Sequence, residues 1–141
     1  MQGIIASLIV GGAIWWIVVE NIQTAGPDDL RIEVGKLRSY VSEAERMTEQ
    51  VQSGSLTANF FQVEIEMLRA KTDGVLTSID SLRPPSALSE KFVESHQLGE
   101  RSRDELVKLA CFYDQPQRMG EEKARLDEIF HQILAVEKSL Q

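Results

Sequence analysis

The chain has 141 residues, which is enough for one domain with a single hydrophobic core after its leading segment. Its 22 acidic and 15 basic residues give a formal net charge of −7, which argues against nucleic acid or an anionic membrane surface as a partner. The single cysteine, Cys111, excludes an internal disulfide and leaves the redox compartment open.

The leading run, residues 1–19, carries no charged side chain. As a helix it would span about 28 Å, close to the hydrocarbon thickness of a bilayer. A cleaved signal peptide and a buried core helix are the alternatives. The run lacks a positively charged leader and a small-residue cleavage site, and it is apolar on every side. We therefore predict a single transmembrane anchor over 1–20, followed by a connector over 21–26.

Two groups of residues in this run predict how the anchor would sit. The tryptophans Trp15 and Trp16 come just before the first acidic residue, where an aromatic belt marks the membrane interface. Small residues recur every four positions and would let another helix approach closely in lipid, although small residues are also common in such helices. These residues are Gly3, Ser7 and Gly11.

The charges near the end of the anchor give two opposing signals about the side of the membrane. Basic residues follow the run and none precede it, which favours a cytoplasmic body. The first charges after the run are acidic, however, and domains of this size are translocated largely regardless of charge. We expect a cell-membrane protein whose bundle is extracytoplasmic or periplasmic.

Four amphipathic segments follow the connector, each with apolar residues at alternating three- and four-residue spacings. Breaks containing glycine or proline separate them, at 53–55, 83–85 and 114–116. We predict helices at about 27–52, 57–82, 86–113 and 117–140. Because short connections force consecutive helices to turn back, the expected fold is all-α. It comprises an N-terminal single transmembrane helix and an antiparallel up-down-up-down four-helix bundle over 27–141.

The predicted third helix has bulky residues at both ends of its apolar seam and small residues in the middle. The small residues are Ser95, Gly99 and Ser102. Either large side chains of a neighbouring helix fill this waist, or a groove remains there for a ligand. Dense packing is the rule in protein interiors, so we expect the first arrangement and keep the groove as a candidate ligand site.

The motifs that could bind a metal or act in catalysis are incomplete. Glu128 and His131 form a Glu-x-x-His motif, but carboxylate-bridged di-iron bundles need a second copy, which this chain lacks. Neither histidine lies on a seam, and Cys111 sits on an apolar stretch typical of an inert buried thiol. Acidic residues such as Glu121 and Glu122 are expected on solvated faces. We therefore predict no enzymatic activity, no cofactor and no metal site; a metal or haem carrier is a third option.

The leading functional hypothesis is a non-catalytic accessory or scaffolding subunit. Its anchor would pack against other helices in the lipid bilayer, and its bundle would brace other subunits of a membrane protein complex. The alternative is a tethered extracytoplasmic or sensory bundle that binds a small molecule. In outline, that alternative resembles the sensory bundles of chemotaxis receptors, which also follow an N-terminal membrane helix. The resemblance implies ligand sensing, but no second membrane span and no signalling region follow the fourth helix here.

Overall fold

The computed structural model describes residues 24–141, and the regular structure in this range is all helical. The helices are α2 (Pro27–Gln52), α3 (Ala58–Ser81), the short 3₁₀ helix η1 (Ser86–Leu88), α4 (Ser89–Cys111) and α5 (Pro116–Ser139). The all-α prediction is confirmed for this part of the chain. The predicted anchor lies outside the described residues, and so do its candidate contact positions Gly3, Ser7, Gly11, Trp15 and Trp16.

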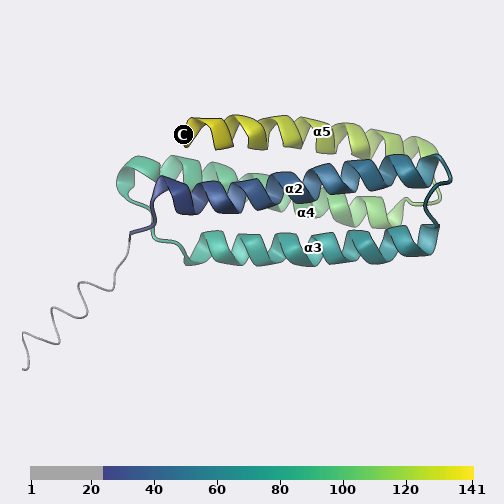
Figure 1. Cartoon of the computed structure of the whole chain (residues 1–141), viewed down its shortest axis with the longest axis horizontal. Coiled ribbons are helices and arrows are strands. Elements are labelled where there is room, and N and C mark those ends of the chain that lie inside the picture. The colour runs from purple at the N-terminus through teal and green to yellow at the C-terminus, as the bar shows by residue number, and fades with distance from the viewer. Residues whose placement is uncertain (1–23) are drawn as a thin grey trace, which may run out of the picture.

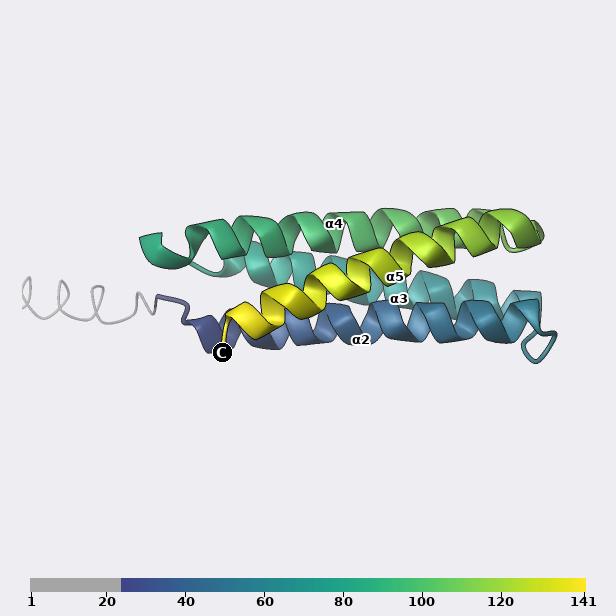
Figure 2. The ribbon, with the colours of Figure 1, turned by 90° about the horizontal axis from the view of Figure 1, so that it is seen from above.

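The four long helices form an elongated antiparallel bundle (Figures 1 and 2). Each of α2 and α4 packs against both α3 and α5, so the helices run in sequence around the bundle. The beginning of α2, the α3–α4 connection and the C-terminus lie at one end (Figure 1). The up-down-up-down arrangement is therefore confirmed. None of the four described α-helices is long and apolar enough to cross a membrane.

The helix boundaries follow local chemistry. At the start of α2, Pro27 takes a position that needs no backbone donor, and the Gly26 N–H donates to Asp29 Oδ2 at 2.8 Å. The Phe60 N–H donates to the Thr57 hydroxyl at 3.4 Å, capping α3. Gly54 in the α2–α3 turn has φ +75°, a left-handed conformation that favours glycine.

The predicted third helix differs at both ends. Its first turn, expected from residue 86, is the separate 3₁₀ helix η1, and α4 begins only at Ser89. α4 ends at Cys111, two residues earlier than predicted. Tyr113, the last residue of the predicted helix, therefore lies beyond α4 and is 36% exposed. The end of α4 also leaves Cys111 exposed, so the prediction of a buried thiol is wrong.

The bundle core is built from the predicted seams. Leu37, Phe61, Leu106 and Leu126, one from each long helix, are fully buried. Polar residues on the seams satisfy their own hydroxyls within the helix: Thr72, for example, donates to the Leu68 carbonyl at 2.9 Å. Most buried hydroxyls therefore need no hydrogen-bond acceptor on a neighbouring helix.

The small waist of α4 is filled by neighbouring side chains. A Cβ added at Gly99 would lie 2.7 Å from Leu76 Cδ2 on α3 and 3.5 Å from Leu37 Cδ1 on α2. Ser95 and Ser102 are fully buried, and their hydroxyls donate to carbonyls of α4 itself. Close packing, the first of our two alternatives, describes this region, and the space beside Gly99 is not an open groove.

Gly99→Val tests this close approach. The added methyl groups would displace Leu76, and we expect the free energy of unfolding to fall by about 1–3 kcal/mol. In the double variant Gly99→Val/Leu76→Ala, the loss should be smaller than the sum of the two single losses, because the clashing leucine methyls are gone. Chemical denaturation measures all three variants.

Gly120→Val is the matched control, because a Cβ at Gly120 meets no atom of the described residues within 4 Å. It should cause no comparable loss. Additive losses in the double variant would contradict the proposed contact between Leu76 and Gly99.

Candidate functional site

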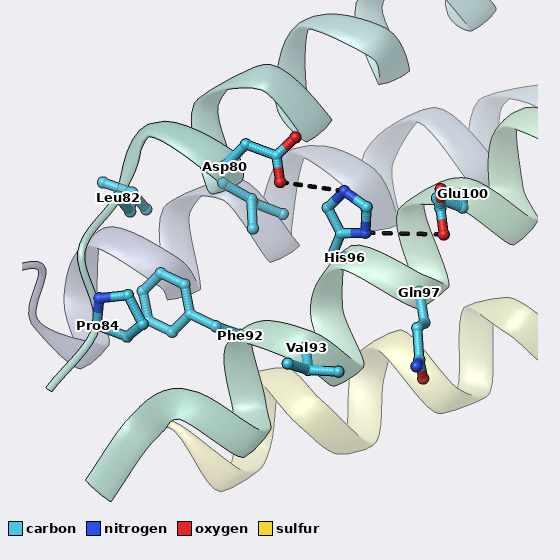
Figure 3. Close-up of a pocket in the computed structure, with 9 residues that line it drawn as sticks. Asp80, Leu82, Pro84, Phe92, Val93, His96, Gln97 and Glu100 are labelled. Atoms are coloured by element: carbon cyan, nitrogen blue, oxygen red, sulfur yellow. Dashed lines mark ion pairs between the residues drawn. The ribbon is translucent and has the colours of Figure 1, made fainter. Parts of the chain in front are cut away.

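A pocket of about 390 Å³ opens between the end of α3 and the beginning of α4 (Figure 3). Its apolar lining comes from both helices and from the connection between them: Ile79, Leu82, Pro84, Phe92 and Val93. Its polar lining is Asp80, His96, Gln97 and Glu100. The volume lies in the range of small-molecule sites. The α3–α4 connection, which supplies Leu82 and Pro84 to the pocket, lies at the same end of the bundle as the beginning of α2 (Figure 1).

His96 is held between two carboxylates in this pocket. Its Nε2 lies 3.1 Å from Asp80 Oδ1 on α3, and its Nδ1 lies 3.7 Å from Glu100 Oε2 one turn along α4 (Figure 3). The imidazole therefore joins the two helices, and when protonated it can donate toward both acids. Sequence reasoning considered His96 only as a metal ligand and missed Asp80, which comes from the preceding helix.

The Glu-x-x-His motif, Glu128 and His131, was the candidate metal site considered in the sequence. His131 is 67% exposed and lies 3.6 Å from Asp127, so it is on the outer surface as expected. Glu128 instead lies 3.8 Å from Arg101. Within residues 24–141, no group of three or more His, Cys, Asp or Glu side chains could hold a metal ion.

A second polar cluster joins α4 to α5 near the opposite end of the bundle. Glu105 and Glu122 are 8% and 4% exposed, so the expectation that Glu122 lies on a solvated face is wrong. Lys108 Nζ lies 2.7 Å from Glu105 Oε1. Arg125 Nη1 lies 3.0 Å from each carboxylate oxygen of Glu122. The four groups form one compact ionic network.

The pKa values of the two carboxyls are shifted in opposite directions. Burial, together with the hydrogen bond to Glu105, raises the pKa of Glu122 above its usual value. Burial alone would also raise the pKa of Glu105, but hydrogen bonds from Glu122 and Lys108 outweigh it and lower that pKa. Glu122 therefore keeps its proton longer and donates it to the Glu105 carboxylate. We assign this network a role in stability, because both carboxyls lie against the cations of Lys108 and Arg125; Glu105 Oε2 has no hydrogen-bond partner among the described residues and lies 4.0 Å from Arg125 Nη1.

Glu122→Gln tests the shared proton. A raised pKa in the folded state stabilises the fold below the unfolded pKa, and this contribution is lost as the pH rises through the folded pKa. Glutamine stays neutral and can donate to Glu105 at any pH. We therefore expect the variant to gain thermal stability relative to the natural chain as the pH rises from 4 to 8, measured by thermal unfolding across that range.

Glu121→Gln, one position away and exposed, should show no such pH-dependent gain. A stability difference for Glu122→Gln that is the same at every pH would rule out the shared proton. Glu105 contributes with the opposite sign, since its lowered pKa adds stability that is lost on acidification.

Comparison with protein-family models, with curated proteins and with solved structures found no match for this chain. We therefore infer its function from its own residues.

Proposed function

We propose that this protein is a non-catalytic, single-pass membrane accessory subunit. Residues 1–20 anchor it in the bilayer, and the bundle over 27–141 braces other subunits of a membrane protein complex. The observation that carries the proposal is an uncharged run, 1–19, which is long enough to cross a bilayer and is followed, after a short connector, by a closed helical bundle. The bundle is extracytoplasmic in this proposal.

The junction between the two parts supports a mechanical role. The Ala25 N–H donates to the Arg83 carbonyl at 3.0 Å, and the Ala25 side chain is buried. The chain is thus fastened to the α3–α4 connection immediately before α2 begins. Any load from the anchor would reach two helices at once, because this contact ties the start of α2 to the end of α3.

Gly11→Leu tests the anchor face. In the proposal, the small residues Gly3, Ser7 and Gly11 let a partner helix approach in lipid, so a leucine should block the partner without reducing hydrophobicity. We expect the variant to stay in the membrane fraction and to lose most of its co-purifying partner in mild detergent. Ile9→Leu, on a different face, is the control and should retain the partner.

Two outcomes would contradict the proposal. One is a natural chain that migrates as a free species in mild detergent with no partner. The other is mature protein in the aqueous fraction that lacks the leading residues.

A second candidate function is small-molecule binding, favoured by the pocket beside His96. Its apolar floor and the two carboxylates at its rim suit a small organic cation with an apolar body. The side chains of Asp80 and Glu100 are exposed, so they could pair with the positive charge of a ligand without a large desolvation cost. In this alternative the anchor only tethers the bundle.

Benzylamine, with benzyl alcohol as its uncharged match, probes this candidate. At a hundred times its dissociation constant, a ligand stabilises the folded state by about 2.7 kcal/mol. We therefore expect benzylamine to raise the melting temperature, benzyl alcohol to raise it less, and Asp80→Asn to remove the difference. Equal behaviour of the two compounds at all concentrations would exclude a cation site.

A further inference from the structure

The outward face of α3 carries a stripe of residues without charge. Starting from Phe60, the stripe repeats at alternating three- and four-residue spacings and comprises Phe60, Val63, Met67, Ala70, Gly74, Thr77 and Ser81, all exposed. Phe60, Val63 and Met67 are 52%, 65% and 42% exposed. The spacing is that of a coiled-coil seam, and it lies opposite the seam through Phe61 and Ile65 that faces the core. α3 therefore has two seams, of which the bundle uses one.

The other long helices of the described bundle expose charges outward. Examples are Lys36 on α2, Asp104 on α4 and Glu128 on α5. The hydroxyls of the stripe on α3 need no partner outside the helix. The Thr77 hydroxyl donates to the Asp73 carbonyl, and the Ser81 hydroxyl donates to the Ser78 carbonyl. An uncharged outward face on one helix, with its hydroxyls already satisfied, is suited to contact with another helix.

The stripe changes in size along its length. Its first half is bulky, and its second half contains Ala70, Gly74 and Thr77. A Cβ at Gly74 would meet no atom of the described residues within 4 Å, so this small residue is not required by packing within the bundle. When two copies of the stripe run antiparallel, the layers pair Phe60 with Thr77, Val63 with Gly74, and Met67 with Ala70. Every bulky side chain then faces a small one.

The flanking charges agree with the same register. The antiparallel pairing brings Glu64 of one copy beside Lys71 of the other, twice by symmetry. On the second flank, Glu66 approaches Asp73 of the other copy, but Arg69 lies 2.8 Å from Glu66 and 3.3 Å from Asp73 within its own helix. One flank is therefore complementary, and the second is partly neutralised.

We propose that α3 is a self-association surface, on which two copies of this chain pack their outward stripes antiparallel. A parallel pairing fits less well, because it sets Phe60 against Phe60 and leaves Gly74 facing Gly74. The proposal uses residues of α3 alone and does not rest on the membrane anchor. It is compatible with one, since a twofold axis along the membrane normal lets both chains enter the same bilayer.

Met67→Glu tests the surface in the full-length chain purified in detergent. It places two carboxylates beside the centre of the paired stripes, so we expect the dimer dissociation constant in sedimentation to rise by about tenfold or more. Val107→Glu is the matched control, because Val107 on α4 is also 42% exposed. It should leave the dimer intact. Circular dichroism of both variants checks that the bundle still folds.

Charge exchange tests the register. Glu64→Lys and Lys71→Glu should each weaken the dimer by about threefold, and the double exchange should restore it. In a parallel dimer Lys71 would instead face Glu66, so the double exchange would not restore binding. Lys71 also lies 5.8 Å from the Tyr40 ring centre, so melting temperatures are compared to separate a loss within the monomer.

Cysteine cross-linking in a Cys111→Ser background tests independently whether the two α3 helices pair antiparallel. Chains with Val63→Cys mixed with chains with Gly74→Cys should form the mixed disulfide, and neither should link to itself. Self-linking of the Val63→Cys chain would show parallel pairing and overturn the proposal. A monomeric natural chain, a dimer that survives Met67→Glu, or a stripe occupied by a different protein would also overturn it.

Discussion

The close approach of α3 to α4 at Gly99 sets the geometry of the whole hairpin. Leu76 of α3 fills the space that a side chain at position 99 would take, so the two helix axes are held together there. In an antiparallel pair, advancing along one helix corresponds to going back along the other. Asp80, one turn after Leu76, therefore falls opposite His96, one turn before Gly99, and their side chains meet at 3.1 Å.

The pocket follows from the same contact and from the prolines beyond it. Pro84 and Pro85 end the helical path, and the chain resumes through η1 before α4 starts at Ser89. Residues 82–85 are not helical, so a longer path joins the two helices at this end. The space between them is lined by the apolar Phe92 and Pro84 and by the carboxylates of Asp80 and Glu100. The contact at Gly99 also fixes how α3 is rotated, and so it directs the stripe containing Val63 and Met67 to the outside.

Much of the bundle could be predicted from the sequence, because seams and breaks are local patterns. The spacing of buried residues such as Leu37, Phe61 and Leu126 and the glycine and proline breaks predicted all four helices and their order. The pocket could not be predicted, because Asp80 and His96 meet only through the register of two helices. The spacing of Glu122 from Met119 and Leu126 puts it on the seam of α5, but its charge led to the prediction of a solvated face. The sequence does not reveal that Glu105 and Arg125 lie beside it and let it be buried.

The two proposals about attachment reinforce one another in physical terms. A stripe with three bulky side chains, flanked on one side by acids of both copies, would pair only weakly in dilute solution, and the net charge of −7 adds repulsion. Chains confined to one bilayer experience an effective concentration of the order of millimolar, so a weak contact becomes a populated dimer. In detergent the same dimer is expected at high protein concentration, where sedimentation detects it. An anchored chain can therefore use a modest surface such as α3 for assembly, whereas a freely diffusing chain would need a larger and more apolar one.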